Sequence, residues 1–332
     1  MNKSDIARKY RDKYGMDMPT LKLARIIYGE NNLTFKSIED ARFTLRYIEG
    51  KAGEKRIKSV INNPEYLMQT DRPKNPYNLP ESFESDFAPF VIKGHKKVLI
   101  LSDVHLPYHN IEALTVALDY GKKEQPDAIL LNGDILDCHK LSRFVKDPKK
   151  RDFASELASF KDFFAILQKT FPKAKVYYKL GNHEERYQHF LLEKAHELIG
   201  VEEFDLANII KARAAGIEVI SDKRPIRMNN LWGLHGHEYP GGISAPVNPA
   251  RGLFLRAKLS CFQGHTHQTS EHTEPTLSGS MVTTFSIGCL SELHPAYMPL
   301  NKWNHGFGFV ELGSDGESFE FRNKRIYKGK LL

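Results

Sequence analysis

A chain of 332 residues is long enough for one or two folded domains. Hydrophobic residues make up 41% of it and charged residues 27%, and neither Gly nor Pro is enriched enough for a collagenous or low-complexity chain. No stretch approaches the roughly 18 apolar residues of a membrane-spanning helix, and the opening MNKSDIARKYRDKYG lacks the apolar run of a signal peptide. Three scattered cysteines argue against a disulfide framework. We therefore expect a folded cytoplasmic protein with no membrane partner.

The positive charge of the chain is concentrated at its N-terminus. Residues 1–60 contain 14 Lys or Arg against 8 Asp or Glu, which accounts for +6 of the net charge of +7. Such an asymmetry favours a module that meets an anion, most often nucleic acid. A solvated basic helix surface has the same composition, so charge alone leaves both interpretations open.

Residues 1–60 are predicted to form a basic three-helix module. The three helices are expected to begin at Ser4, Pro19 and Ser37, and a glycine follows the end of each helix. The outline resembles a helix-turn-helix module whose third helix lies in a major groove, although a helical cap or a protein-docking element has the same pattern. The candidate nucleic-acid contacts are Arg42, Arg46, Lys51, Lys55 and Arg56.

Residues 61–95 contain five prolines and no sustained periodicity, which is typical of a linker, and their aromatic residues allow them to lie across the next domain. From residue 96 to 332, short apolar runs alternate with stretches of helical spacing, which predicts an α/β domain. Later runs have less helix between them, which predicts a second sheet packed on the first. The predicted strands are 97–101, 128–131, 176–180, 231–234, 259–262, 281–287, 306–312 and 318–322, and the predicted helices are 111–122, 154–167 and one from about 249.

Ligand-type side chains follow five of the predicted strands. Open α/β sheets place their sites outside the carboxyl ends of strands, so we expect the five loops to meet although they span residues 103–267. A single loop histidine is more often hydrogen-bonded than ligating, but five matching segments in order argue against that interpretation for the set. The residues are Asp103 and His105 after KVLIL, Asp134 and Asp137 in NGDILD, Asn182 and His183 in GNHE, His235 and His237 in HGH, and His265 and His267 in GHTH.

The ordered motifs D-x-H, G-D-x-x-D, G-N-H-E, H-G-H and G-H-T-H resemble those of the calcineurin-like metallophosphoesterase superfamily over roughly residues 96–312. The resemblance implies an α/β fold in which two β-sheets pack face to face as a sandwich flanked by helices. The small N-terminal helical module and the segment NKWNHGFGFVEL are similar to versions from phages and prophages. The expected location is therefore the cytoplasm of a bacterial cell or a phage-infected host.

The resemblance also implies a dinuclear metal site in which Asp134 bridges the two ions. Imidazole, carboxylate and amide ligands suit Mn²⁺, with Fe or Zn²⁺ as alternatives, and the lack of thiolates argues against a closed structural zinc site. Two cations about 3.5–4 Å apart can share a hydroxide that attacks phosphorus. The implied ligands are Asp103, His105 and His267 for one ion and Asn182, His235 and His265 for the other.

The departing oxygen needs a proton, and the resemblance implies His183 as the general acid with Asp137 orienting it. Glu184 is expected to hold its loop rather than to react. The candidates for substrate contact are His237, His139, Arg251 and Arg186.

The second motif departs from that of the phosphoprotein phosphatases, in which an Arg after G-D-x-x-D grips the phosphate dianion. Here the run is GDILDCHK, and Cys138 stands at that position. A missing bidentate contact costs a monoesterase more than a diesterase, because a diester has one charge and two free oxygens. We therefore expect a phosphodiesterase or nuclease. The alternatives are a phosphomonoesterase with a protein-docking module and a binding protein without catalysis.

Overall fold

The computed structural model of the chain describes residues 2–15, 18–49, 79–80, 87–143, 152–221, 223–239 and 247–332. They belong to two compact units, Met1–Ser85 and Asp86–Leu332. The predicted contacts Lys51, Lys55 and Arg56 lie outside the described residues, as does most of the predicted linker.

The first unit contains the three predicted helices, α1 (Lys3–Tyr14), α2 (Thr20–Glu30) and α3 (Ile38–Ile48). Asn2 rather than Ser4 caps α1, because the Asn2 Oδ1 accepts the amide of Asp5 at 2.9 Å, and Ser4 is already helical. Ser37 caps α3 as predicted. The buried core of the unit consists of Ile6, Ala7, Leu23, Ala24, Ile27, Phe35, Ala41 and Leu45.

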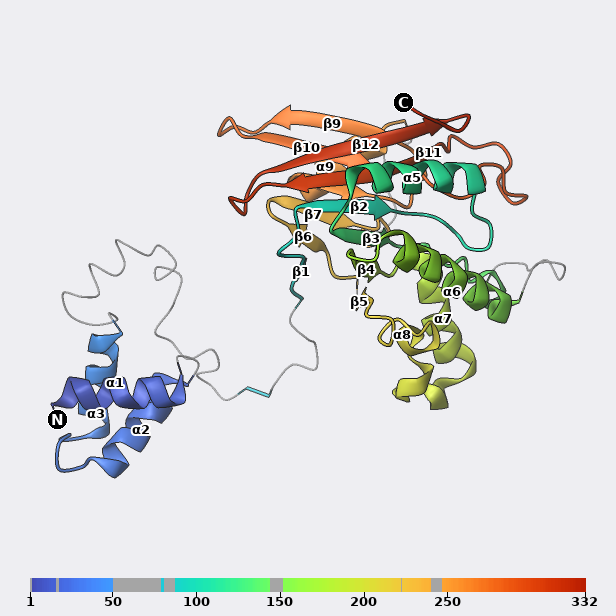
Figure 1. Cartoon of the computed structure of the whole chain (residues 1–332). Helices are drawn as coiled ribbons and strands as arrows, with labels where there is room; N and C mark the ends of the chain where they lie inside the picture. The colour runs from blue at the N-terminus through green and yellow to red at the C-terminus, as the bar shows by residue number, and fades with distance from the viewer. Residues whose placement is uncertain are drawn as a thin grey trace. The chain divides into compact units, whose positions relative to one another are not determined.

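The second unit is a sandwich of two β-sheets with helices outside, as the resemblance implied (Figure 1). One sheet has the strand order β13-β12-β11-β2-β3-β4-β5 and the other has β1-β6-β7-β8-β10-β9. The strands are β1 (Phe90–Val91), β2 (Lys97–Leu101), β3 (Ala128–Asn132), β4 (Lys175–Lys179), β5 (Glu218–Ile220), β6 (Ile226–Met228), β7 (Leu231–Leu234), β8 (Cys261–Gln263), β9 (Ser270–Pro275), β10 (Met281–Ser286), β11 (His305–Leu312), β12 (Phe319–Tyr327) and β13 (Lys330–Leu331). The longer helices are α5 (Ile111–Glu124), α6 (Phe153–Thr170), α7 (Asn182–Lys194) and α9 (Pro249–Ala257), and α8 (Leu206–Ile209) is a single turn.

The central strands are apolar throughout because both faces of their sheet are covered. In β2, Val98 and Ile100 belong to the core between the two sheets, whereas Leu99 and Leu101 belong to the core beneath the helices. β3 follows the same alternation. Parallel strands buried on both faces give continuous hydrophobic runs, which is why these strands were predictable from sequence.

Several elements differ from the prediction. The residues 90 and 91, within the predicted linker, form β1 and pair with β6, so the second unit begins before residue 96. β5 and β6 are three residues long, too short for periodicity to reveal. None of the helices in the described ranges is long and apolar enough to cross a membrane.

Truncating Leu45 to alanine should destabilise the first unit and leave the second unchanged. Leu45 is fully buried in the three-helix core, and such a Leu→Ala change costs about 2–5 kcal/mol of unfolding free energy. Scanning calorimetry of the whole chain should show the unfolding transition of the first unit at a lower temperature than in the wild type, and that of the second unit at an unchanged temperature. Leu33→Ala, at a fully exposed position, is the control. If both transitions shifted together, the two units would not unfold independently.

Candidate metal centre

The loops that carry the predicted ligands leave neighbouring strands. β2, β3 and β4 are parallel neighbours in one sheet, and β7 and β8 are parallel neighbours in the other, so each set of loops starts from one sheet edge. Side chains of these loops form three groups, two of which share His105, and within each group the potential ligand atoms all lie within 4.8 Å of one another. The groups are Asp103 with His105 and His267, Asp134 with His235 and His265, and His105 with Asp137 and His183.

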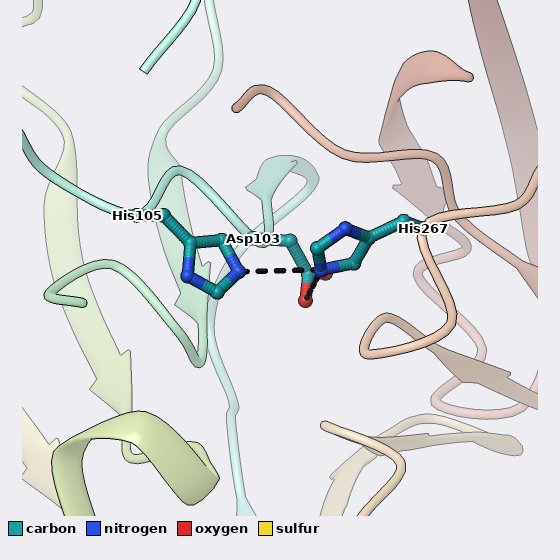
Figure 2. Close-up of side chains that lie close together, drawn as sticks. All are labelled: Asp103, His105 and His267. Atoms are coloured by element: carbon teal, nitrogen blue, oxygen red, sulfur yellow. Dashed lines mark hydrogen bonds and ion pairs between the residues drawn. The ribbon is translucent and has the colours of Figure 1, made fainter. Parts of the chain in front are cut away.

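The first group joins residues that are 162 positions apart in the sequence (Figure 2). The Nε2 atoms of His105 and His267 face each other at 3.2 Å, and the His267 Nε2 lies 3.2 Å from the Asp103 Oδ1. All three residues are buried. Two imidazole nitrogens and a carboxylate oxygen thus converge on one point, as the ligands of a single cation do.

The second group is built around His235. Its Nδ1 donates to the carbonyl oxygen of Asn132 at 2.8 Å, which leaves Nε2 facing the Asp134 Oδ2 at 3.2 Å and the Asn182 Oδ1 at 3.3 Å. A histidine whose other nitrogen is held by a carbonyl is the usual arrangement of a metal ligand. His265 completes this group, with its ring centroid 5.3 Å from that of His235.

Asp134 lies between the two groups. Its Oδ2 is 3.2 Å from the His235 Nε2 in the second group and 3.9 Å from the His105 Nε2 in the first. Its Oδ1 accepts the backbone amide of His183 at 2.9 Å. Asp134 thus has one carboxylate oxygen near a histidine of each group, and its bridging role remains a prediction.

The electrostatics of the site fit cations. Asp103 and Asp134 are almost fully buried, and within the described ranges both carboxylates form their ion pairs with histidines. Burial lowers the pKa of His235, but the Asp134 carboxylate outweighs it and raises the value to about 10. The same balance with Asp103 raises the pKa of His267 to about 10. A field that draws protons onto buried imidazoles also attracts divalent cations, which would displace those protons.

Five of the seven implied ligands lie in a strained part of backbone space. Left-handed φ angles are uncommon outside glycine and gather at functional sites, where the surrounding structure must hold them. The residues, with φ between 51° and 63°, are Asp103, His105, Asp134, His265 and His267.

The geometry agrees with a match to known sequences. A family model described as Calcineurin-like phosphoesterase matches residues 96–269, just over half of the chain. The chain belongs to the calcineurin-like phosphoesterases. It is therefore a metal-dependent phosphoester hydrolase, and the family implies divalent cations at the two ligand groups.

Individual proteins that resemble this chain share a quarter of its residues or fewer. The Gene 54 protein of Mycobacterium phage L5 is 25% identical over 237 residues, which cover 67% of this chain and 90% of that protein. Vacuolar Protein Sorting 29 from Cryptosporidium parvum is 12% identical with a TM-score of 0.39, covering 72% of this chain and 95% of that one. A dimetal phosphatase from Danio rerio is 13% identical with a TM-score of 0.35, covering 66% and 93%.

The phosphoesterase loops are held by Glu184, which is buried at the start of α7. Its carboxylate accepts the backbone amides of Asp134, Ile135, Leu136 and Gly181 at 2.7–3.0 Å and the hydroxyl of Tyr178 at 2.7 Å. Glu184 therefore ties the second ligand loop to the third, as expected of a residue that holds its loop. Glycine is needed at 181, because a Cβ there would overlap the Asp134 carboxylate.

A second glutamate, Glu238, which was not predicted from the sequence, holds the fourth loop in the same way. Glu238 accepts the amides of His235 at 2.9 Å and Gly236 at 2.6 Å, and it pairs with the fully buried Lys179 at 2.9 Å. Burial opposes ionisation of Glu238, yet Lys179 and His235 lower its pKa to about 2. Two features of the sequence could have indicated this contact: a glutamate three residues after the ligand His235, and a lysine at the end of a buried strand.

His183 and Asp137 are in contact, as the implied acid pair requires. The His183 Nδ1 lies 3.1 Å from the Asp137 Oδ1 and 2.9 Å from the Asp137 carbonyl oxygen. Asp137 also contacts the His105 Nδ1 at 3.0 Å, so one carboxylate orients a ligand and the candidate acid together. Burial lowers the pKa of His183, but Asp134 and Asp137 outweigh it and raise the value.

Of the predicted substrate contacts, Arg186 is the most closely joined to the site. It donates from Nη2 to the His183 Nε2 at 2.9 Å and from Nη1 to the Asp137 carbonyl oxygen at 2.8 Å. The His237 ring is 5.3 Å from that of His235 and bonds Glu185 at 2.8 Å. The His139 Nδ1 lies 3.8 Å from the Asp137 Oδ2. Arg251 is exposed on α9, and within the described ranges no hydrogen bond or ion pair joins its side chain to the ligand groups.

Asp134→Asn should lower the bound metal content and abolish phosphoesterase activity, because it removes the charge that lies between both ligand groups. Elemental analysis of protein purified with added Mn²⁺, together with hydrolysis of an aryl phosphodiester, measures both effects. Asp119→Asn, an exposed position on α5, is the matched control. Full metal content in the Asp134 variant would contradict the bridging assignment.

Proposed function

We propose that this phosphoesterase is a phosphodiesterase that cleaves nucleic acid in the cytoplasm of a bacterial or phage-infected cell, with two Mn²⁺ ions bound by the seven implied ligands. The observation that carries the choice of a diester is that position 138 holds no forked cation. Cys138 is completely buried, so it cannot reach a substrate. Arg186 lies against the acid, and both of its terminal nitrogens already donate within the site.

A phosphomonoester carries two charges and three free oxygens, and it gains most from an arginine whose two parallel N–H groups are free. A diester carries one charge and two free oxygens, so it needs less positive charge from side chains. The arrangement of Arg186 therefore favours a diester. When bound, the two cations supply an activated water and offset the charge of the phosphoryl oxygens.

The residues of the chain perform the remaining steps. His183 lies where it can protonate the departing oxygen, and Asp137 holds the ring in orientation through Nδ1. Arg186 donates to the His183 Nε2 at 2.9 Å, so this nitrogen carries no proton while the contact holds. The leaving group would displace the guanidinium, and His183 would take up at Nε2 the proton that it passes to the departing oxygen, because Asp134 and Asp137 raise its pKa.

The basic first unit is proposed to bind the phosphate backbone. Arg42 pairs with Glu39, one turn away at 3.4 Å, and an exposed pair of this kind contributes less than about 1 kcal/mol, so phosphate can replace it. Arg46 is half-buried on the same helix. Contacts of this kind are independent of base sequence.

A second candidate is a phosphomonoesterase whose first unit docks a protein. The observation in its favour is an exposed aromatic pair on α3, Phe43 and Tyr47, which lie one turn apart beside the two arginines. Exposed aromatic residues are enriched where proteins bind one another.

Replacing His183 with alanine should slow cleavage of a dinucleotide by about 10²–10⁴-fold, because its alkoxide leaving group needs a proton. A 4-nitrophenyl diester should lose much less, because nitrophenolate departs without one. Rates on the two substrates, with metal content measured in parallel, make the comparison. His189→Ala, exposed on the same helix, is the control. Equal losses on both substrates would mean that His183 acts by position or charge alone.

Removing residues 1–85 should weaken binding to duplex DNA and flatten its salt dependence. Each phosphate that the protein no longer neutralises reduces the slope of log K against log salt by about 0.9. Hydrolysis of a small diester should change little, since every implied ligand lies in the second unit. Binding isotherms between about 0.05 and 0.2 M salt measure the slope. Identical slopes, or no binding by either protein, would move the phosphomonoesterase candidate ahead.

A further inference from the structure

Beside the first ligand group lies a loop, residues 293–303, that neither the motifs nor the proposed reaction uses. It connects the end of β10 with β11 and returns to the site at its C-terminal end, where the amide of Asn304 donates to the carbonyl oxygen of the ligand His267 at 2.9 Å. The loop therefore borders the metal centre.

Two aromatic side chains of the loop form a continuous path away from the centre. The rings of Trp303 and His267 have centroids 4.1 Å apart, and the Tyr297 ring lies edge-on to Trp303 at 6.3 Å. Trp303 is half-buried, whereas Tyr297 is 66% exposed. Tyr297 is thus connected through Trp303 to the predicted metal ligand His267, and its own ring is accessible to a substrate.

The charges at Tyr297 agree with a position at the rim of the site. Although most of the residue is exposed, partial burial of its hydroxyl group, together with the negative charges of Asp137 and Asp134, raises its pKa to about 12. The hydroxyl stays neutral at physiological pH and does not repel a phosphate.

The loop holds this conformation through its own side chains. The Asn301 amide donates to the carbonyl oxygens of Leu293 at 2.6 Å and Met298 at 2.8 Å, and its Oδ1 accepts the amide of Trp303 at 2.9 Å. The His294 Nδ1 donates to the carbonyl oxygen of Pro299 at 3.0 Å. An exposed aromatic ring on a loop fixed in this way is prepared to bind, because little conformational entropy remains to be lost.

We infer that Tyr297, supported edge-on by Trp303, forms a stacking platform for a nucleobase next to the phosphate that is cleaved. This rests on the proposed function, and it assigns the residues that recognise the base. Every base has a flat face that can stack on an aromatic ring, whatever the sequence. Proteins that bind single-stranded nucleic acid without sequence preference use exposed aromatic rings beside phosphate-binding sites in this way. Since a paired base is stacked within its duplex, the platform fits a single-stranded substrate or an end.

The test compares two diesters that differ only in the base. Thymidine 5′-(4-nitrophenyl) phosphate and its abasic counterpart, 1,2-dideoxyribose 5′-(4-nitrophenyl) phosphate, have the same reacting phosphorus. In both, water adds to phosphorus and 4-nitrophenolate leaves with the bonding electron pair. Base stacking predicts that wild-type kcat/KM with Mn²⁺ is higher for the thymidine diester by about 5- to 150-fold.

Tyr297→Ala should bring this ratio to within about twofold of one, whereas Tyr297→Phe, which keeps the ring, should preserve it. The loss should lie mainly in KM, because stacking is equally strong before and during the reaction. Leu300→Ala, an exposed aliphatic position on the same loop, is the matched control and should keep the ratio. Calorimetric binding of thymidine 5′-monophosphate, which does not depend on turnover, should weaken in parallel in Tyr297→Ala.

Two results would overturn the platform alone: a wild-type protein that cleaves both diesters equally, or a Tyr297→Ala variant that keeps the preference. A wild-type protein that cleaves neither diester but dephosphorylates a phosphotyrosine peptide would overturn the proposed function and the platform with it.

Discussion

The second unit depends on burying two aspartates in a ring of histidines at the ends of its strands. Asp103 and Asp134 are almost inaccessible, and imidazoles face both of them. Buried carboxylates are costly unless cations accompany them, and here the field is strong enough to raise the pKa of two histidines to about 10. Divalent cations would replace the protons on these histidines and neutralise the buried carboxylates. Metal binding is therefore expected to stabilise the site.

Holding that charge in place requires a scaffold around the ligand loops. Glu184 and Glu238 accept backbone amides of two of these loops, so the strained turn at Asp134 and the turn at His235 are tied through the main chain as well as through their ligand side chains. Glu238 also pairs with the fully buried Lys179, where loss of the carboxylate would leave an uncompensated charge. These hydrogen bonds orient the loops that carry the ligands, as a catalytic metal centre requires.

In the proposed function, the surroundings of the centre rather than its ligands select a diester as the substrate. The ligand groups are those of a family that acts on many phosphoesters, whereas the buried Cys138, the engaged guanidinium of Arg186 and the aromatic loop are features of this chain. Together they combine little additional positive charge with an exposed aromatic ring, which suits the diester flanked by a base that we propose. In the proposed function, the basic first unit adds affinity for the polyanion from a separate unit of the chain.

The order of the amino acids is enough to predict the layered fold, the succession of the ligand loops and the residue types at the centre. Central strands covered on both faces leave continuous apolar runs, and a ligand set needs particular side chains at fixed places after those runs. Three-dimensional packing was needed to find that Asp137 serves two histidines, that Lys179 meets Glu238 and that Tyr297 reaches Trp303 beside His267. Most of these contacts join residues far apart in the chain, and pairs of that kind leave no periodic trace in the sequence. The short strand β1 and the cap at Asn2 escaped prediction for a related reason, since each depends on one or two local hydrogen bonds that several neighbouring residues could equally have made.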